Sequence, residues 1–392
     1  MNRILKIAFL SLLLLLFAVP AQASGDVVVG AARPDQYLPI LKGKRVALLS
    51  NHTGTVGYKH ILDLMLENGV NVTTLFSPEH GFRGTADAGE HVNSSVDAAT
   101  GIPIASLYDG KRRGPAPEVI DSIDIIVCDI QDVGLRYYTY YCTMLELMNS
   151  ASQHGKEFLV LDRPNPNGMY VDGPILDMKY SSGVGRLPIP IVHGMTLGEL
   201  AKMIVGEGWL KDNEKGLTLH VVPCLNYTHA TRYELPVAPS PNLRTMHSIY
   251  LYPATCYFEG TPVSLGRGTD APFEIYGHPD YKGSDFSFTP RSVPGAKNPP
   301  LKDQLCYGVD LRGLSDEDII AKGVDLSYVI DAYNRTGLGD KFFTKFFELL
   351  VGRGDIRGMI MEGRSADEIK ATWADDVKSF RKQRAPYLLY AE

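Results

Sequence analysis

Short apolar runs alternate with helical segments through the first two-thirds of the chain. The apolar runs predict buried strands at residues 45–50, 70–76, 123–130, 157–162 and 217–224. Helical spacing follows at residues 59–68 and 141–152, and Thr196 and Glu199 form a capping-box pattern that opens a third helix. This order of strands and helices predicts an α/β fold, a sheet with helices on both faces.

The composition changes near Pro236. Through about residue 300 the chain is rich in Pro, Gly and Tyr, and a second capping-box pattern at Ser365 and Glu368 opens an amphipathic helix through Trp373 and Phe380. We therefore predict a catalytic domain over residues 24–238 and a smaller α+β domain over residues 239–392 that closes the cleft.

Residues 1–23 have the pattern of a secretory signal peptide. Arg3 and Lys6 precede an apolar stretch over residues 7–19, and Ala21-Gln22-Ala23 supplies the small residues of a cleavage site. The stretch is shorter than the ~20 residues that a membrane span needs. We expect a mature chain that starts near Ser24 and is periplasmic or secreted, with no membrane contact after cleavage.

Charge and cysteine content narrow the classes of partner and cofactor. The formal charge of −6 becomes −8 once the leader's two cations are removed, which argues against nucleic acid or an anionic membrane. The 5 cysteines are far apart, lie mostly in apolar runs and form no C-x-x-C pair. We expect buried thiols, although one disulfide would be compatible with export.

Polar residues collect where the predicted strands end. If the strands are parallel, these residues share the carboxyl edge of the sheet, where α/β proteins bind ligands. The strand-end residues are Asn51 and His52; Glu79 and His80; Gln131, Asp132, Gly134 and Arg136; Asp162, Arg163, Asn165 and Asn167; and His193 and Gly194. Single clusters have ordinary explanations, since Asn165 and Asn167 suit a turn, Asp132 could cap a helix, and His193 could be a turn residue.

The sequence motifs of several common active and binding sites are missing from this chain. SNHTGTVG after the first strand does not match the G-x-G-x-x-G of nucleotide-binding sheets, and a G-x-S-x-G elbow is absent. H-E-x-x-H is also missing, and His52, His80, His91, Asp129, Asp132 and His193 are too scattered to indicate a metal site strongly. We predict no cofactor and no metal.

Carboxylate chemistry remains. Partial burial of Glu79 at a strand end would raise its pKa and let it donate a proton, as a glycosidase acid must. Asp129, Asp132, Asp162 or Glu90 could act as the base or stabilise charge. Guanidinium groups suit an anionic substrate, and the candidates are Arg83, Arg136, Arg163 and Arg267. Tyrosines at 137, 138, 140 and 141 could stack on sugars or pack in the core.

Long motifs in these regions allow a comparison with a known family. They are SNHTG, LFSPEHGFRG, DIQDVGLRYYTY, LDRPNPNG, IPIVHGMTLGELA, PSPN and FEGTPVSLGRGTDAPFE, followed by the W-x-x-D-V-x-x-F-x-x-x-R-x-x-Y-L-L-Y tail. In this order they resemble the NamZ-type exo-β-N-acetylmuramidases across nearly the whole mature chain. One departure is Pro262, where the family pattern has Asn.

The resemblance implies a Rossmann-like first domain, a smaller second domain and an exo-acting glycosidase. Such an enzyme releases N-acetylmuramic acid from the non-reducing end of peptidoglycan fragments, so muropeptides or disaccharides are the expected partners. The family's proposed catalytic glutamate maps onto Glu79, and the lactyl carboxylate of the sugar gives the arginines a ligand. A second carboxylate as base or nucleophile, or assistance by the acetamido group, remains open.

These inferences give a predicted site. The predicted catalytic residues are Glu79, His80, Asp129 and Asp132. The predicted substrate-binding residues are Asn51, His52, Arg83, Glu90, Gln131, Arg136, Tyr137, Asp162, Arg163, Asn165, His193, Asn242 and Arg267. Two alternatives are a non-catalytic muropeptide receptor and a metal-dependent cell-wall amidase or deacetylase.

Overall fold

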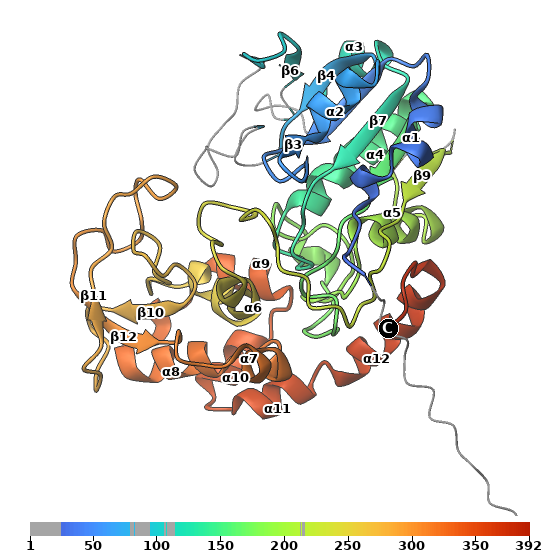
Figure 1. Ribbon diagram of the computed structural model, residues 1–392. Helices are drawn as coiled ribbons and strands as arrows, with labels where there is room; N and C mark the ends of the chain where they lie inside the picture. The colour runs from blue at the N-terminus through green and yellow to red at the C-terminus, as the bar shows by residue number, and fades with distance from the viewer. Residues whose placement is uncertain are drawn as a thin grey trace, which may run out of the picture.

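The chain folds into a larger domain around a mostly parallel sheet and a smaller α+β domain beside it (Figure 1). The structure is a computed structural model that describes residues 25–78, 82, 95–105, 107, 114–211, 213 and 216–392. The predicted fold class is therefore confirmed.

The main sheet has the strand order β5-β6-β4-β1-β7-β8-β9. All neighbouring pairs are parallel except β5 with β6. Its strands are β1 (Val46–Ser50), β4 (Val72–Phe76), β5 (Ser95–Val96), β6 (Pro103–Ala105), β7 (Ile125–Asp129), β8 (Glu157–Leu161) and β9 (Leu219–Val222). Numbered along the chain, the parallel strands follow the 3-2-1-4-5-6 order of Rossmann folds, which reverses between β1 and β7.

Alternate side chains of the strands enter two separate cores, as the two-residue period of a strand requires. On β1, Ala47 and Leu49 pack with one core, whereas Val46 and Leu48 pack with the other. The first-domain helices that contribute to the first core are α3 (Pro117–Asp121), α4 (Tyr140–His154) and α5 (Leu197–Gly206), and this core continues into the helices of the second domain. The second core is covered by α1 (Pro34–Leu41) and α2 (Ile61–Glu67), so both faces of the sheet are buried.

The predicted helix starts are largely confirmed. Thr196 and Glu199 form the predicted capping box of α5, and Ser365 and Glu368 form that of α11. The amphipathic helix predicted through Phe380 is instead two helices, α11 (Ala366–Ala371) and α12 (Ala374–Arg384). The break coincides with Trp373, which is buried and donates from Nε1 to Asp172 Oδ1 at 2.9 Å.

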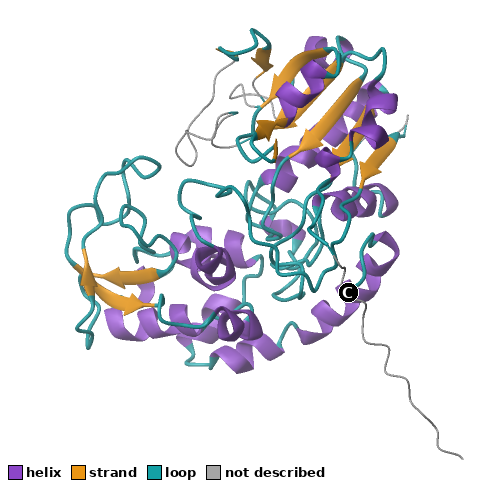
Figure 2. Cartoon of the chain, viewed as in Figure 1, coloured by secondary structure: helices purple, strands orange, loops and turns teal. Residues whose placement is uncertain are grey.

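The second domain combines a small antiparallel sheet with several short helices (Figure 2). The sheet has the order β10-β12-β11, and a separate hairpin of β2 (Thr55–Val56) and β3 (Lys59–His60) belongs to the first domain. The elements of the second domain are α6 (Met246–Thr255), β10 (Ile275–His278), β11 (Ser287–Phe288), β12 (Cys306–Asp310), α7 (Asp316–Lys322), α8 (Ser327–Thr336), α9 (Lys345–Val351) and α10 (Ile356–Met361), followed by α11 and α12.

The last residues of the chain return to the first domain. The Tyr390 hydroxyl donates to Asp162 Oδ2 at 2.6 Å, and the Leu389 amide donates to Glu199 Oε1 at 2.8 Å. The His229 amide donates to the carbonyl of Ala391 at 2.8 Å. The C-terminal tail is thus part of the packing around α5, and the predicted boundary at residues 238 and 239 stays a prediction.

All five cysteines are buried and free, as expected. Within the described ranges, no helix is both long and apolar enough to cross a membrane.

Arg136 is a buried polar link between the loops of the first domain and the second domain. Its guanidinium is fully buried. Nη1 donates to the carbonyls of Pro174 and Ile189 at 2.9 and 3.1 Å, and Nη2 donates to those of Leu350 and Val351 at 2.8 Å each. One side chain therefore satisfies acceptors from three distant segments.

We expect Arg136→Met to lower the free energy of unfolding by about 2–4 kcal/mol, because buried carbonyls lose their donors. Urea unfolding monitored by fluorescence measures this change. Arg291→Met removes a matched arginine from an exposed ion pair with Asp303 and should leave the unfolding midpoint unchanged. Equal midpoints for Arg136→Met and Arg291→Met would show that the four contacts do not stabilise the fold.

Candidate active site

The ends of β1 and β7 are joined by hydrogen bonds at the point where the strand order reverses. Asn51 Oδ1 accepts from the Thr53 amide and hydroxyl at 3.0 and 2.6 Å, and the Thr53 hydroxyl accepts from the Gln131 amide at 3.0 Å. Gln131 Nε2 donates to the carbonyl of Pro164, 2.7 Å away, beyond the end of β8. The predicted gathering of Asn51 and Gln131 at one edge is therefore seen, at the usual ligand position of such a sheet.

Tyrosines before and at the start of α4 connect this edge to the segment that enters the second domain. Asn51 Nδ2 donates to the Tyr140 hydroxyl at 3.0 Å, and the hydroxyls of Tyr140 and Tyr138 donate to the carbonyl of Pro239 at 3.1 and 2.9 Å. His52 Nε2 lies 2.9 Å from the carbonyl of Ala238. Residues 238–239 therefore cross over the carboxyl ends of the strands.

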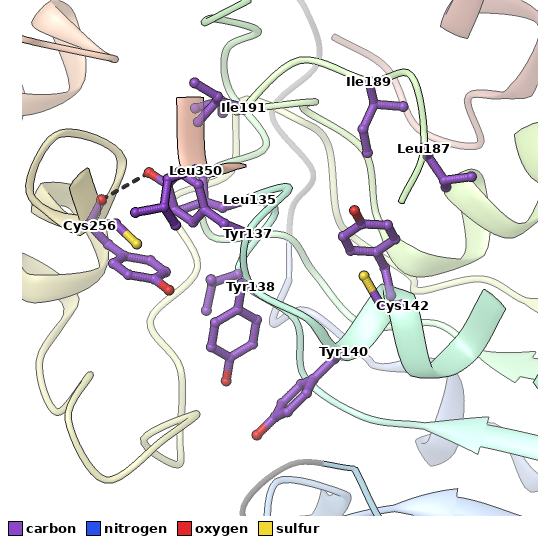
Figure 3. Close-up of a cluster of buried hydrophobic side chains, with 14 of the residues drawn as sticks. Leu135, Tyr137, Tyr138, Tyr140, Cys142, Leu187, Ile189, Ile191, Cys256 and Leu350 are labelled. Atoms are coloured by element: carbon purple, nitrogen blue, oxygen red, sulfur yellow. Dashed lines mark hydrogen bonds between the residues drawn. The ribbon is translucent and has the colours of Figure 1, made fainter. Parts of the chain in front are cut away.

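A cavity of about 190 Å³ lies beside these tyrosines, and both domains line it. Figure 3 shows Tyr137, Tyr138 and Tyr140 between Cys142 of α4 and Cys256 of the second domain. The polar and aromatic side chains that line the cavity include Tyr138, Tyr140, Asn242, Glu259, Arg267 and Phe273. Aromatic faces combined with polar groups at the edges suit the binding of a sugar ring.

Asn242 brings a buried polar atom to this cavity. The side chain is only 3% exposed, and Nδ2 donates to the carbonyl of Gly295 at 2.8 Å. Oδ1 is buried and has no hydrogen-bond partner among the residues that the structure describes. A buried acceptor without a donor is unfavourable, and a ligand N–H or O–H would satisfy it.

Arg267 stands between this inner cavity and an outer one of about 590 Å³. Its Nη2 donates to Glu259 Oε1 at 2.6 Å, and its guanidinium lies 5.0 Å from the centre of the Phe273 ring. Glu259, Arg267 and Phe346 line both cavities, and the outer one adds Lys297 and Asn298. Thr261 and Val263 also line the outer cavity, so the unusual Pro262 stands between two of its wall residues.

Asp132 is a buried carboxyl with an elevated pKa. Oδ1 accepts from the Gly134 amide at 2.7 Å, whereas Oδ2 has no hydrogen-bond partner within the described parts of the chain. Burial raises the pKa of Asp132 to about 7, and backbone hydrogen bonds oppose this shift. At neutral pH such a carboxyl is divided between its acid and base forms, which is compatible with the catalytic role predicted for it.

Asp129, also predicted as catalytic, is held in a buried ion pair. Arg163 Nε and Nη2 donate to its two carboxylate oxygens at 2.6 and 2.9 Å, and Nη2 also donates to the carbonyl of Thr55 at 3.0 Å. Asp129 is 0% and Arg163 5% exposed. Through this bidentate contact both residues help to join β7, β8 and the β2–β3 hairpin. Neither residue lines the inner or the outer cavity.

Other predicted binding residues also make hydrogen bonds to groups within the protein. Asp162 accepts from the Thr196 and Tyr390 hydroxyls at 2.6 Å each, and burial raises its pKa to about 6. Asn165 Nδ2 donates to the carbonyl of Met195 at 2.9 Å. His193 Nδ1 accepts from the Met195 amide at 3.2 Å, and burial lowers the pKa of His193 to about 3, so the ring is neutral.

The geometry limits what two predicted binding residues, Arg136 and Tyr137, can contact. Arg136 was expected to bind substrate, but it is fully buried and its terminal nitrogens donate to four backbone carbonyls. Tyr137 does line the inner cavity, but its hydroxyl donates to the carbonyl of Tyr252 at 3.1 Å and its ring packs edge-on against the Tyr252 ring. A ligand in the cavity can therefore contact the ring of Tyr137, whereas its hydroxyl is already hydrogen-bonded within the protein.

Glu79, His80, Arg83 and Glu90 lie outside the described residues, so their roles stay predictions. The strand that leads towards them is β4, which pairs with β1 through Leu49 and Phe76. Ser77 and Pro78 therefore leave the sheet at the same carboxyl edge as Asn51. The metal site left open by the sequence has no support in the described ranges, where no cluster of three or more His, Cys, Asp or Glu side chains is suited to an ion.

Glu259 was not singled out from the sequence, although it lies in the FEGTPVSLGRGTDAPFE motif. Its only sequence signal was its spacing of eight residues from Arg267, which lies in the same motif. Phe273 and Tyr252 were missed for a similar reason, because an aromatic residue in an apolar stretch is more often part of the core.

Comparison with known proteins covers nearly the whole chain. Residues 46–247 match the family profile described as exo-beta-N-acetylmuramidase NamZ, N-terminal, and residues 250–390 match the corresponding C-terminal profile. The peptidoglycan beta-N-acetylmuramidase NamZ of Bacillus subtilis (strain 168) is 40% identical over 376 residues, which cover 91% of this chain and 89% of the relative.

Two crystal structures of DUF1343 family proteins from Bacteroides fragilis NCTC 9343 have the same fold. The first is 57% identical with a TM-score of 0.88, and the match covers 94% of this chain and 100% of the other. The second is 29% identical with a TM-score of 0.78, covering 93% and 99%.

The elevated pKa of Asp132 predicts a pH-dependent stability. Because the folded pKa of about 7 lies above the ordinary value of 3.8, the folded state binds the proton more tightly. The contribution of Asp132 to stability should be greatest below pH 4 and fall as the pH rises to 7, by up to about 1.4 kcal/mol per pH unit. Above pH 7 it should be constant.

The test compares urea unfolding of wild type and Asp132→Asn between pH 4.5 and 8. The stability difference should shift in favour of the variant up to pH 7. Asp124→Asn is the matched control, because the Arg45 hydrogen bond lowers the pKa of Asp124 to about 2, outside this range. A difference between wild type and Asp132→Asn that does not vary with pH would contradict the raised pKa.

Proposed function

Because the chain belongs to the NamZ exo-β-N-acetylmuramidase family, we propose that it is an exo-acting glycoside hydrolase of peptidoglycan turnover. It releases N-acetylmuramic acid from the non-reducing end of peptidoglycan fragments. The observation that carries this proposal is the match of both family profiles, in order, over residues 46–247 and 250–390. The relative from Bacillus subtilis bears the corresponding activity in its name.

The inner cavity supports a sugar substrate. Tyr138 and Tyr140 give it aromatic walls at the ends of β1 and β7, and Asn242 and Arg267 add polar groups from the second domain. Binding between two domains lets the enzyme exclude bulk water from the site while it still admits the one water that hydrolysis consumes, and the strand ends hold the polar groups fixed.

In the mechanism that we propose, Glu79 protonates the glycosidic oxygen, and His80 and Arg83 hold its carboxyl group. Glycosidases commonly pair such an acid with a second carboxylate. Among the described residues, Asp132 is the carboxyl group that best suits the role of this second carboxylate. One of its oxygens has no hydrogen-bond partner there, and its pKa is about 7. Asp129 is already neutralised by Arg163.

We further propose that the enzyme acts outside the cytoplasm. Residues 1–23 have the features of a cleavable leader, and its removal leaves an acidic protein whose substrate is wall material. Muropeptides or disaccharides with a terminal N-acetylmuramic acid are then the molecules that it meets in the periplasm or after secretion.

Glu79→Gln should lower the rate of hydrolysis of N-acetylmuramyl-β-1,4-N-acetylglucosamine by about 10²–10⁴-fold, because the leaving group loses its proton donor. Mass spectrometry of the released N-acetylmuramic acid measures the rate. The disaccharide is preferable to a muramoside with an activated leaving group, which depends less on the acid.

Glu118→Gln, an exposed position on α3, is the matched control and should retain the wild-type rate. A parallel reaction with a chelator should also be unaffected. An intact disaccharide with wild type would favour a binding protein, and loss of activity with the chelator would favour a metal-dependent enzyme. Full activity of Glu79→Gln would remove Glu79 from the acid role.

Expression of the full chain in a Gram-negative host should give a periplasmic protein whose mass corresponds to residues 24–392. Intact-mass measurement of the periplasmic fraction checks both the export and the cleavage site. A version with Arg3 and Lys6 replaced by Asp should accumulate uncleaved. Full-length protein in the cytoplasm of the wild-type culture would contradict the leader assignment.

A further inference from the structure

Arg267 is distinguished from the other described arginines of the predicted site by its surroundings. Arg136 is fully buried and its terminal nitrogens already serve four carbonyls, and Arg163 holds both oxygens of Asp129. The side chain of Arg267 keeps 20% of its surface exposed and borders two cavities. Its guanidinium is therefore the one of the three that a ligand can reach.

The guanidinium of Arg267 has donors left for a ligand. Glu259 accepts from Nη2, and among the described residues no other hydrogen bond to this side chain is found. A guanidinium carries five N–H donors in a fixed planar arrangement, and Glu259 accepts from one of them, so other N–H groups of Arg267 remain for a carboxylate in the cavity. The Phe273 ring below the guanidinium restricts its position.

The surroundings of Arg267 would strengthen an ion pair between its guanidinium and a ligand carboxylate. Tyr252, Phe273 and Phe346 line the inner cavity around Arg267 and contribute apolar surface to its walls. Charged hydrogen bonds in a partly desolvated site are stronger than those at an open surface. Glu259 balances part of the charge of Arg267, which reduces the free-energy cost of burying much of the guanidinium.

A second observation in the same cavity points independently to a ligand. Asn242 is 97% buried, and its unpartnered Oδ1 belongs to a residue that lines the cavity wall. A ligand with an anionic group for Arg267 and an N–H or O–H donor for Asn242 would complement both residues. N-acetylmuramic acid has both, because its lactyl ether ends in a carboxylate and its ring carries hydroxyl and acetamido groups.

We propose that Arg267 binds the lactyl carboxylate of the terminal N-acetylmuramic acid and thereby sets the specificity of the enzyme. This inference rests on the proposed function and adds to it the residue that rejects N-acetylglucosamine, which lacks the lactyl group. Asn242 accepts a hydrogen bond from the same sugar. Glu259 positions Arg267 at the junction of the two cavities.

The experiment measures binding of two sugars by calorimetry, N-acetylmuramic acid and its lactyl methyl ester. Wild type should bind the acid about 10–100-fold more tightly, as expected for a hydrogen-bonded ion pair. Arg267→Met should lose this preference by weakening only the binding of the acid, and its affinity for the ester should change less than about threefold. Arg267→Lys should retain an intermediate preference, because it keeps the charge without the planar fork.

Arg312→Met, which removes an exposed arginine paired with Asp310, is the matched control and should bind both sugars like wild type. Thermal unfolding of all variants identifies any that are misfolded, and Arg267→Lys supplies the answer if Arg267→Met does not fold. Equal loss of both sugars in Arg267→Met, or no preference for the acid in wild type, would overturn the proposal. Hydrolysis of the disaccharide by wild type tests the proposed function separately, since it does not depend on the acid-to-ester ratio.

Discussion

The buried guanidinium of Arg136 is a fixed point in the arrangement of the two domains. It connects the loop after β7 to the carbonyls of Pro174 and Ile189 and to the end of α9. The contact requires Gly352 (φ +80°), where a Cβ atom would lie 2.6 Å from Nη2 of Arg136. Because the tyrosines of the inner cavity follow Arg136 directly in the chain, its anchoring also fixes where their rings stand.

The polar residues at the sheet edge divide into two groups. Asp129, Arg163 and Asp162 are paired with one another or with distant segments, and they hold the strand ends in place. Asn242 and Arg267 come from the second domain and retain polar atoms towards the cavities. The sheet thus supplies a rigid platform, and the second domain supplies groups that a ligand can engage, as preorganised sites require.

The fold was predictable because its signals are local, whereas much of the site was not. The apolar runs and the capping boxes act over a few positions and indicated the sheet and its helices correctly. The use of each polar side chain depends on partners far away in sequence, such as Leu350 for Arg136 and Tyr390 for Asp162. The break between α11 and α12 at Trp373 could not be predicted for the same reason, because the hydrogen-bond partner of Trp373 is the distant residue Asp172.

The return of the C-terminal tail to α5 means that the second domain is attached to the first at both of its ends. The incoming connection crosses the strand ends at Pro239, and the outgoing one is fastened through Tyr390 and Glu199. A domain tethered once can swing about a single hinge, but one tethered twice moves mainly by sliding along the interface or twisting about the line between its tethers. Any opening of the cleft should therefore be a limited sliding or twisting of the second domain rather than a free rotation about one connection.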